Sequence, residues 1–306
     1  MNKHTENKAL TTTTATPTAS SRISLVDELK ALVKFKLSLT VLMSSMLAYL
    51  IVAAGSFSWT VFILLSVGGF LVTGAANALN QVLERDFDKL MERTKNRPLA
   101  AERMKISDAV LFAGFSAAIG IIMLALINPL TALLGTLSLI SYAFVYTPLK
   151  RYSTISVAVG AIPGALPVLI GTVAGEGTIT ALGLGLFAIQ FLWQFPHFWA
   201  IGWLSFQDYK KAGYKLLPMN EAGEIDRNLG FYSGIYATLM IPVFTTMYLL
   251  DSRISLSALI VSIILSCIYV FYCIQFQRKG DRKSARSLMF SSFFYLPLFL
   301  LTYILL

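Results

Sequence analysis

Residues 58–98 read SWTVFILLSVGGFLVTGAANALNQVLERDFDKLMERTKNRP, a long apolar run that passes without a break into a highly charged stretch. The apolar part, 58–80, has the roughly 20 residues that an α-helix needs to cross a hydrocarbon core about 30 Å thick. The charged part, 77–98, holds four acidic and five basic side chains. We therefore expect a membrane helix that carries a cluster of charges to the membrane edge.

The composition of the whole chain is typical of an integral membrane protein. Of its 306 residues, 56% are hydrophobic and 13% are charged, and the mean hydropathy is +0.68. Inside lipid only helices and closed barrels satisfy every backbone polar group, and apolar runs of about 20 residues indicate helices. An all-α polytopic bundle of about nine transmembrane helices around one central cavity is therefore predicted, from apolar runs at 36–55, 58–80, 107–127, 130–147, 154–174, 180–203, 229–250, 254–276 and 287–306.

Charge is distributed unevenly among the connections. Those after the first, third, fifth and seventh runs are short, and of 25 Lys and Arg only Arg253 falls in them, which leaves 25 − 1 = 24 on the other side. Because Lys and Arg accumulate on the cytoplasmic side of a membrane, we expect the N-terminus and every charged loop to be cytoplasmic. The basic residues are divided among loops without interleaved aromatic side chains, which argues against a nucleic-acid partner.

Residues 1–24 are polar and rich in Thr and Ser, which predicts a disordered tail. This tail makes a poor transit peptide, so we expect the cell inner membrane rather than the mitochondrial inner membrane. Residues 25–306 are expected to form a single transmembrane domain. Its first segment, 25–36, is predicted to be an amphipathic helix at the cytoplasmic surface, with headgroup contacts from Lys30, Lys34 and Lys36.

Three oxygen-bearing side chains mark the end of the second run. Asn80, Glu84 and Asp88 recur every four residues, so on a helix they line one face. Carboxylates aligned in this way repel each other unless a cation lies between them. Mg²⁺ suits such hard oxygens, because it usually binds through one or two carboxylates plus substrate phosphates. The neighbouring basic residues are of the types that hold phosphate oxygens: Arg85, Lys89, Arg93, Lys95 and Arg97. This pattern predicts a magnesium–diphosphate site, and the alternative is a solvated, salt-bridged loop.

A second cluster of polar residues surrounds the end of the sixth run. Pro196 is expected to kink this helix, with His197 beside the kink, and Asp208 follows at the cytoplasmic end. The fourth run ends on the same side of the membrane with Tyr146, Lys150 and Arg151. We expect these three charged elements to converge on one polar mouth that leads into an apolar cavity.

Together these motifs resemble a known family. They are NxxxExDxD at 80–88, MERTxxRP at 91–98, YxxxKR at 146–151, WQFPHF at 193–198 and DYxxAG at 208–213. Over about residues 30–300 the chain is similar to the UbiA-type intramembrane prenyltransferases and, within that superfamily, to the protohaem IX farnesyltransferases. Two positions depart from the superfamily pattern. Glu84 replaces the commoner Asp, and Ala212 reduces the second acidic pair to a single carboxylate, as in the haem branch.

The resemblance implies an enzyme that transfers the farnesyl group of farnesyl diphosphate to a vinyl group of haem B to make haem O. It implies Mg²⁺ as the cofactor, and catalytic metal ligands at Asn80, Glu84, Asp88 and Asp208. The implied diphosphate-binding residues are Tyr146, Arg93, Arg97, Lys150 and Arg151. The implied partners are farnesyl diphosphate, haem B and membrane lipid, with haem A synthase or terminal-oxidase assembly proteins as further candidates.

His197 is one of two histidines in the chain, and an ionisable residue inside a membrane is a functional candidate by default. Two roles stay open: contact with haem through ligation of its iron, or a hydrogen bond to carbonyls freed by Pro196.

Two other functions of the protein stay open as well. Prenyl transfer to a quinone precursor or another aromatic acceptor would share the diphosphate site. A transporter would place its charged residues near the bilayer midplane instead of at one surface.

The charge asymmetry predicts that the two ends of the chain lie on opposite sides of the membrane. A reporter fused before Met1 should be cytoplasmic and one fused after Leu306 should not, because an odd number of spans separates them. Accessibility labelling of both fusions in intact cells measures this. Two termini on the same side would contradict the count of nine spans.

Overall fold

The structure, a computed structural model, describes residues 24–306, and over that range the chain is helical, with a single isolated β-bridge. The tail predicted at 1–24 lies outside the described residues except for Ser24, which caps the first helix. The helices are α1 (Leu25–Leu32), α2 (Phe35–Val52), α3 (Trp59–Asp88), α4 (Ile106–Ala125), α5 (Pro129–Ile140), the π-helical η1 (Ser141–Tyr146), α6 (Thr147–Leu149), α7 (Ser156–Glu176), α8 (Ala181–Leu204), α9 (Phe206–Lys211), α10 (Leu229–Leu250), α11 (Leu256–Lys279) and α12 (Arg282–Leu305).

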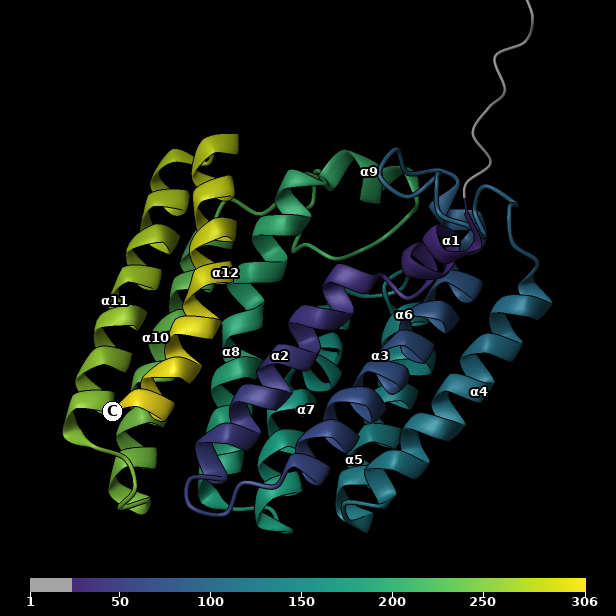
Figure 1. Ribbon diagram of the computed structural model, residues 1–306. Helices are drawn as coiled ribbons and strands as arrows, with labels where there is room; N and C mark the ends of the chain where they lie inside the picture. The colour runs from purple at the N-terminus through teal and green to yellow at the C-terminus, as the bar shows by residue number, and fades with distance from the viewer. Residues whose placement is uncertain (1–23) are drawn as a thin grey trace, which may run out of the picture.

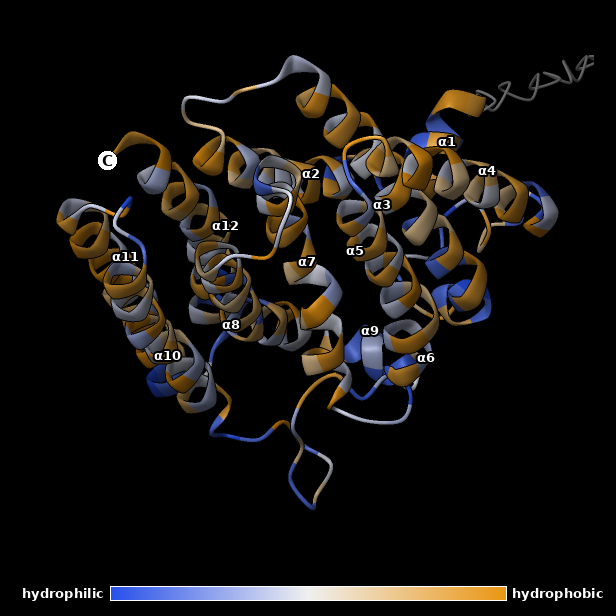
Figure 2. Ribbon diagram, turned by 90° about the horizontal axis from the view of Figure 1, so that it is seen from below, coloured by the Kyte–Doolittle hydropathy of each residue, from blue (hydrophilic) through white to orange (hydrophobic). Residues whose placement is uncertain are grey.

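Eight of these helical segments are long and apolar enough to cross a membrane, with α5, η1 and α6 forming one of them. The remaining long helix is α8, which matches the predicted run 180–203. It has 24 residues and carries Gln190, Gln194 and His197 on a buried face. The long helices lie side by side, with α1, α6 and α9 toward one end of the bundle (Figure 1). The loops that follow α3 and α9 lie at this end and carry many of the charged residues. Seen along the bundle, the helices are mainly hydrophobic and the hydrophilic residues concentrate in loops and near α6 and α9 (Figure 2).

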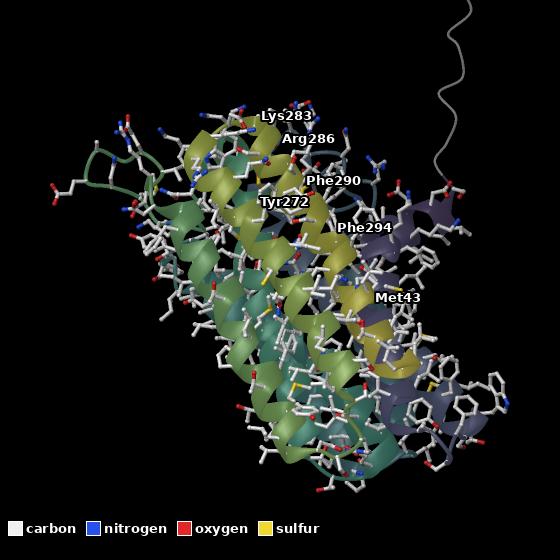
Figure 3. The ribbon with its side chains drawn as sticks, turned by 90° about the vertical axis from the view of Figure 1, so that its left-hand side faces the viewer. Met43, Tyr272, Lys283, Arg286, Phe290 and Phe294 are labelled. Carbon is white, nitrogen blue, oxygen red and sulfur yellow. The ribbon has the colours of Figure 1, made fainter. Side chains whose placement is uncertain are left out.

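The flank formed by α11 and α12 shows how the bundle meets lipid. Tyr272, Phe290 and Phe294 point outward from it, and Phe294 is 68% exposed. Lys283 and Arg286 lie at the charged-loop end of the same flank (Figure 3). Exposed aromatic side chains along the middle of a helix are more stable in hydrocarbon than in water. Together with the eight membrane-length segments, they make this a multi-pass membrane protein.

The predicted helix at 25–36 is divided in two. α1 ends at Leu32, Lys34 adopts a left-handed backbone with φ of 49°, and α2 begins at Phe35. Lys30 stays at the surface beside Asp27, but Lys34 turns inward and its Nζ donates to Asn80 Oδ1 at 2.6 Å. The prediction that Lys34 contacts headgroups is therefore wrong, because the sharp turn between surface helix and span directs its ammonium at the polar face of α3.

Close packing of α2 against α7 organises the centre of the bundle. Gly171 of α7 lies against the backbone of α2, and a Cβ at this position would collide with the carbonyl oxygen of Ser45. α7 is buried along most of its length, so its contacts hold the helices on either side. A glycine is needed here because it lets two backbones approach each other.

The Gly171→Ala variant should be less stable than the wild type, since overpacking a tight core contact costs about 1–3 kcal/mol. The matched control is Gly114→Ala in α4, where a Cβ meets nothing within 4 Å. That control should be neutral or slightly stabilising, because alanine favours helix over glycine by about 1 kcal/mol. Thermal melts of both purified variants in detergent compare them, and equal melting temperatures would contradict the packing assignment.

Candidate active site

The inner face of α3 is lined with polar side chains near its C-terminal end. The helix does not stop at residue 80, as the apolar run suggested, but continues to Asp88. Asn80, Glu84 and Asp88 therefore share one face, as predicted, and all three are buried. Asp86 points away from them into solvent, where it pairs with Arg85 and Lys89. The alternative of a solvated, salt-bridged loop describes Asp86 but not the other three residues.

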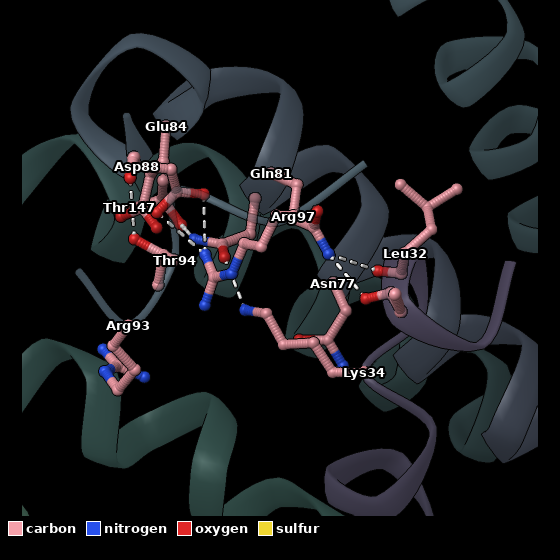
Figure 4. Close-up of polar contacts among 12 residues, drawn as sticks. Leu32, Lys34, Asn77, Gln81, Glu84, Asp88, Arg93, Thr94, Arg97 and Thr147 are labelled. Atoms are coloured by element: carbon pink, nitrogen blue, oxygen red, sulfur yellow. Dashed lines mark hydrogen bonds and ion pairs between the residues drawn. The ribbon is translucent and has the colours of Figure 1, made fainter. Parts of the chain in front are cut away.

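Each of these three side chains accepts a hydrogen bond from a basic residue, and Figure 4 shows the pair of Arg97 with Asp88. The pairs are Lys34 Nζ with Asn80 Oδ1 at 2.6 Å, Lys150 Nζ with Glu84 Oε1 at 2.6 Å, and Arg97 Nη1 with both Asp88 oxygens at 2.7 and 2.9 Å. Charge-assisted bonds of this kind are the stronger ones. The carboxylates that repel each other along α3 are thus neutralised within the protein.

The basic residues reach α3 from three different segments. Arg97 comes from the loop that follows α3, Lys150 from the end of α6, and Lys34 from the turn between α1 and α2. Burial alone would lower the pKa of Lys150, but the Glu84 carboxylate beside it raises that pKa above its usual range. The predicted convergence of the elements after the second and fourth runs is confirmed. Lys34 was not predicted to be here.

The element after the sixth run also joins this mouth. The Asp208 carboxylate of α9 accepts from the backbone N–H of Arg93 at 3.4 Å, and Arg93 Nη2 donates to Tyr209 Oη at 3.3 Å. These bonds fasten α9 to the loop that carries Arg97. The guanidinium of Arg151 lies over the ring of Phe87, 4.5 Å from its centroid.

The donor set of α3 fits a magnesium ion that is shared with a substrate. Within residues 24–306, no three His, Cys, Asp or Glu side chains gather closely enough to enclose a metal ion by themselves. Mg²⁺ does not require such a cage, because it keeps several waters and uses one or two carboxylates with substrate phosphates. The carboxylates of Glu84 and Asp88 and the amide oxygen of Asn80 are hard ligands of the required kind. Asp208 approaches the same mouth from α9.

Tyr214 is a site residue that the sequence did not reveal. Its side chain is buried, and its hydroxyl has no hydrogen-bond partner in the part of the chain that the structure describes. Lys150 Nζ lies 5.8 Å from the centroid of its ring. Burial, together with the carboxylates of Glu84 and Asp88, raises the pKa of Tyr214 well above its usual range, so the hydroxyl keeps its proton. The one feature of the sequence that could have indicated its role is its position directly after Gly213, which turns the chain back with φ of 72°.

Tyr146 lies where the polar mouth meets the apolar cavity. It ends the π-helical turn η1, and Lys150 Nζ lies 4.5 Å from the centroid of its ring. Single π-helical turns are frequently found at functional sites. Gly160 of α7 makes room for this ring, because a Cβ there would meet it at 2.5 Å.

A cavity of about 280 Å³ extends from Tyr146 into the bundle. Its polar lining includes Asn77, Tyr142, Gln194 and His197, and the rest of the lining is largely apolar. Several lining residues are also exposed on the outer surface, and they lie on α2 and α12: Leu37, Met43 and Phe293. The cavity therefore reaches the lipid-facing surface between these two helices.

His197 is buried in the cavity wall, and Nδ1 of its ring is 2.7 Å from Ser292 Oγ of α12. Its ring stacks on Trp193, with centroids 4.8 Å apart. Among the described residues, His197 makes no hydrogen bond to a carbonyl freed by Pro196. The second role considered for His197, a bond to those carbonyls, is therefore wrong. Instead the side chain joins α8 to α12.

Comparison with known proteins agrees with this geometry. The UbiA prenyltransferase family matches residues 41–296 of the chain. This chain belongs to that family. It is therefore an intramembrane prenyltransferase. It is 39% identical over 289 residues to a protein named protoheme IX farnesyltransferase from Christiangramia forsetii, and the match covers 92% of this chain and 94% of that relative.

Solved structures share the fold. A structure described as digeranylgeranylglyceryl phosphate synthase in membranes superposes with a TM-score of 0.75 at 16% identity, covering 91% of this chain and 97% of that one. A UbiA homolog from Archaeoglobus fulgidus bound to GPP and Mg²⁺ gives a TM-score of 0.64 at 13% identity, covering 91% of this chain and all of that one. At these identities the likeness establishes the all-helical UbiA fold.

The ion pair between Arg97 and Asp88 should contribute much more to stability than surface pairs do. Arg97→Met leaves the Asp88 carboxylate, 1% exposed, without its partner, and breaking a buried pair costs on the order of 3 kcal/mol. In the control, Lys95→Met breaks a pair with Glu92 that is 45% and 73% exposed, and such pairs contribute about 0–1 kcal/mol. Thermal melts should show a clear drop for the first variant alone. Similar melting temperatures would indicate that water or another group neutralises Asp88.

Proposed function

We propose that this prenyltransferase transfers the farnesyl group of farnesyl diphosphate to a vinyl group of haem B, giving haem O, with Mg²⁺ as its metal ion. The observation that carries the proposal is the junction of two environments: a mouth of buried carboxylates and basic residues opens into a largely apolar cavity with a histidine in its wall. The name of the relative from Christiangramia forsetii supports haem as the acceptor.

The basic residues of the mouth stabilise the leaving group. Departure of diphosphate develops negative charge that preorganised cations are suited to neutralise. When bound, Mg²⁺ adds electrostatic stabilisation of the same oxygens. Lys150 and Arg97 are paired with the carboxylates that would ligate the ion. When the metal and the diphosphate bind, these two cations would exchange their carboxylate partners for phosphate oxygens. The carboxylates thus hold the two cations ready until substrate arrives.

A second group of side chains closes the mouth from the loop side. Arg93 and Arg151 supply further cations, and Asp208 holds the Arg93 backbone in place. The hydroxyl of Tyr214, which keeps its proton beside the Glu84 carboxylate, is a donor for a phosphate oxygen. These groups would add to the cations and donors that the diphosphate meets in the mouth.

The cavity protects the reactive farnesyl cation. Its largely apolar lining excludes water that would quench the cation. The Tyr146 ring lies at the junction with the mouth, where its face can stabilise the developing positive charge. Attack by a haem vinyl group then forms the new carbon–carbon bond, and water later completes the hydroxyethylfarnesyl product.

The acceptor would enter from the bilayer. A cavity of about 280 Å³ is small for a porphyrin with a prenyl chain, since pockets for small ligands are commonly about 300–1,000 Å³. The opening between α2 and α12 allows part of the ligand to remain at the lipid-facing edge. In this position the iron would approach His197.

The charged mouth is proposed to face the cytoplasm from the cell inner membrane. α1, α6, α9 and the loop after α3 all lie at one end of the bundle (Figure 1), and Lys283 and Arg286 lie at the same end. Accumulation of Lys and Arg on one side is the mark of the cytoplasmic face. Farnesyl diphosphate would then bind from the cytoplasm.

The direct test is to incubate membranes containing the protein with haem B, farnesyl diphosphate and Mg²⁺, and to look for haem O by mass spectrometry. Formation of haem O that depends on all three supports the proposal. If the protein instead prenylates only an added quinone precursor, the acceptor assignment fails and the general prenyl transfer stands.

Replacing Asp88 with Asn should reduce turnover by roughly 10²-fold or more, the scale for loss of one preorganised electrostatic contact. The matched control is Asp86→Asn, in the same motif but exposed and paired only with surface residues. Its turnover should stay close to the wild type. Because Asp88 is buried and paired with Arg97, activity is normalised to folded protein measured by its melt. Full Mg²⁺-dependent activity of the Asp88 variant would place the metal elsewhere.

Replacing His197 with Ala should weaken haem B binding and leave farnesyl diphosphate binding nearly intact, because His197 lies in the cavity and not in the charged mouth. Titration of the purified variant with each substrate measures both affinities. Unchanged haem affinity in a variant with a normal melt would remove His197 from the acceptor site. Equal losses for both substrates would indicate a structural role only.

A further inference from the structure

Ser292 makes a chain of hydrogen bonds that determines which nitrogen of His197 carries the proton. Its Oγ donates to the carbonyl oxygen of Met289 at 2.5 Å, one turn earlier in α12. A hydroxyl has a single proton to give. The 2.7 Å bond between Ser292 Oγ and His197 Nδ1 must therefore run in the other direction, with Nδ1–H donating.

This direction leaves Nε2 of His197 without a proton. In a neutral imidazole one nitrogen donates and the other carries a free lone pair. No hydrogen bond to Nε2 is present among residues 24–306, and His197 lines the cavity. A ring whose Nδ1–H is held by an acceptor and whose Nε2 is bare is prepared to bind a metal.

The ring is also held in orientation by α12. Ser292 contributes a second bond, from Trp193 Nε1 to its carbonyl oxygen at 3.0 Å, and Trp193 stacks on His197. Phe293 contacts the imidazole edge-on, with centroids 5.1 Å apart. The hydroxyl of Ser292 is fully buried, so water does not compete for the Nδ1 proton.

We infer that Ser292 is a positioning residue that holds His197 in the Nδ1–H tautomer and so directs the Nε2 lone pair at the iron of a haem in the cavity. This inference rests on the proposed function, because it takes haem as the acceptor. Histidines that bind metals generally donate their other N–H to a fixed acceptor, and losing that acceptor costs about 10–100-fold in affinity or activity. Without Ser292 Oγ the proton can move to Nε2 and remove the ligand.

The test uses three purified variants of the full chain titrated with haem B. Ser292→Ala removes the acceptor, Ser292→Thr keeps an Oγ, and Ser291→Ala is the control, because Ser291 Oγ bonds only to the Leu288 carbonyl on the outer side of α12. We expect roughly tenfold weaker haem binding for Ser292→Ala, with a shifted or lost iron–histidine stretching band in the resonance Raman spectrum of the ferrous complex. Ser292→Thr should restore both, and Ser291→Ala should match the wild type. Farnesyl diphosphate affinity should be unchanged in all three.

A double-mutant cycle with His197→Ala keeps the inference testable if Ser292→Ala lowers stability. In the His197→Ala background, removing the hydroxyl should have no further effect on haem affinity, because the group through which it acts is gone. An equal loss in both backgrounds would overturn the inference and make Ser292 purely structural. So would an unchanged band and affinity in Ser292→Ala.

Failure of the function itself has a different signature. If His197→Ala retains the iron–histidine band, both the ligation by His197 and the role of Ser292 are overturned, while haem O formation by the wild type decides the transferase reaction separately. Absence of haem O formation with normal haem binding would overturn the proposed reaction and leave the Ser292–His197 relation to be judged from the spectra.

Discussion

Two carboxylates lie almost out of contact with water at one end of a membrane helix, and much of the surrounding structure serves to neutralise them. Glu84 is 5% and Asp88 is 1% exposed. A buried charge without a partner is strongly destabilising, so each carboxylate requires a cation from another segment. Lys150, 66 residues from Glu84, and Arg97, nine residues from Asp88, supply them. The pair of Lys150 with Glu84 holds the end of α6 against α3, and the pair of Arg97 with Asp88 holds the loop after α3 against the same helix. Under the proposed function the same charges would serve the reaction, since cations held by carboxylates are available to a diphosphate that arrives with its metal.

The space beside this mouth depends on irregular helices. Pro167 leaves the carbonyl of Pro163 without its usual helical donor, and Ser138 Oγ reaches it at 3.4 Å. Gly164 lies against Gln194, whose amide donates to the Ala161 carbonyl. The Ser138 hydroxyl of the neighbouring helix thus satisfies the carbonyl that Pro167 releases, as membrane helices require, and Gln194 adds a further bond to the backbone of α7. Pro163 and Gly164 of this stretch line the cavity.

The arrangement separates the two halves of a difficult reaction. Charged side chains gather at the mouth, where α3, α6 and α9 meet, and the apolar reactants of the proposed reaction would lie in the cavity, where α8 and α12 face each other. Tyr146 stands between these regions, with Lys150 on one side and the cavity on the other. An amphiphile with a charged head and an apolar tail fits this division. The polarity of such a substrate would align it with the division between mouth and cavity.

The sequence by itself determined the properties that depend on near neighbours. Apolar runs predicted an all-helical membrane bundle, and the spacing of Asn80, Glu84 and Asp88 placed them on one face, because helical periodicity is a local property. The tertiary structure alone decided which distant groups meet. Lys34 turns inward to Asn80 over a separation of 46 residues, and His197 finds Ser292 over 95. Tyr214 reaches the mouth only because its loop folds back over α3 and α6. These contacts were beyond prediction, since a left-handed turn, a loop path and the facing of two helices are set by the packing of the whole bundle.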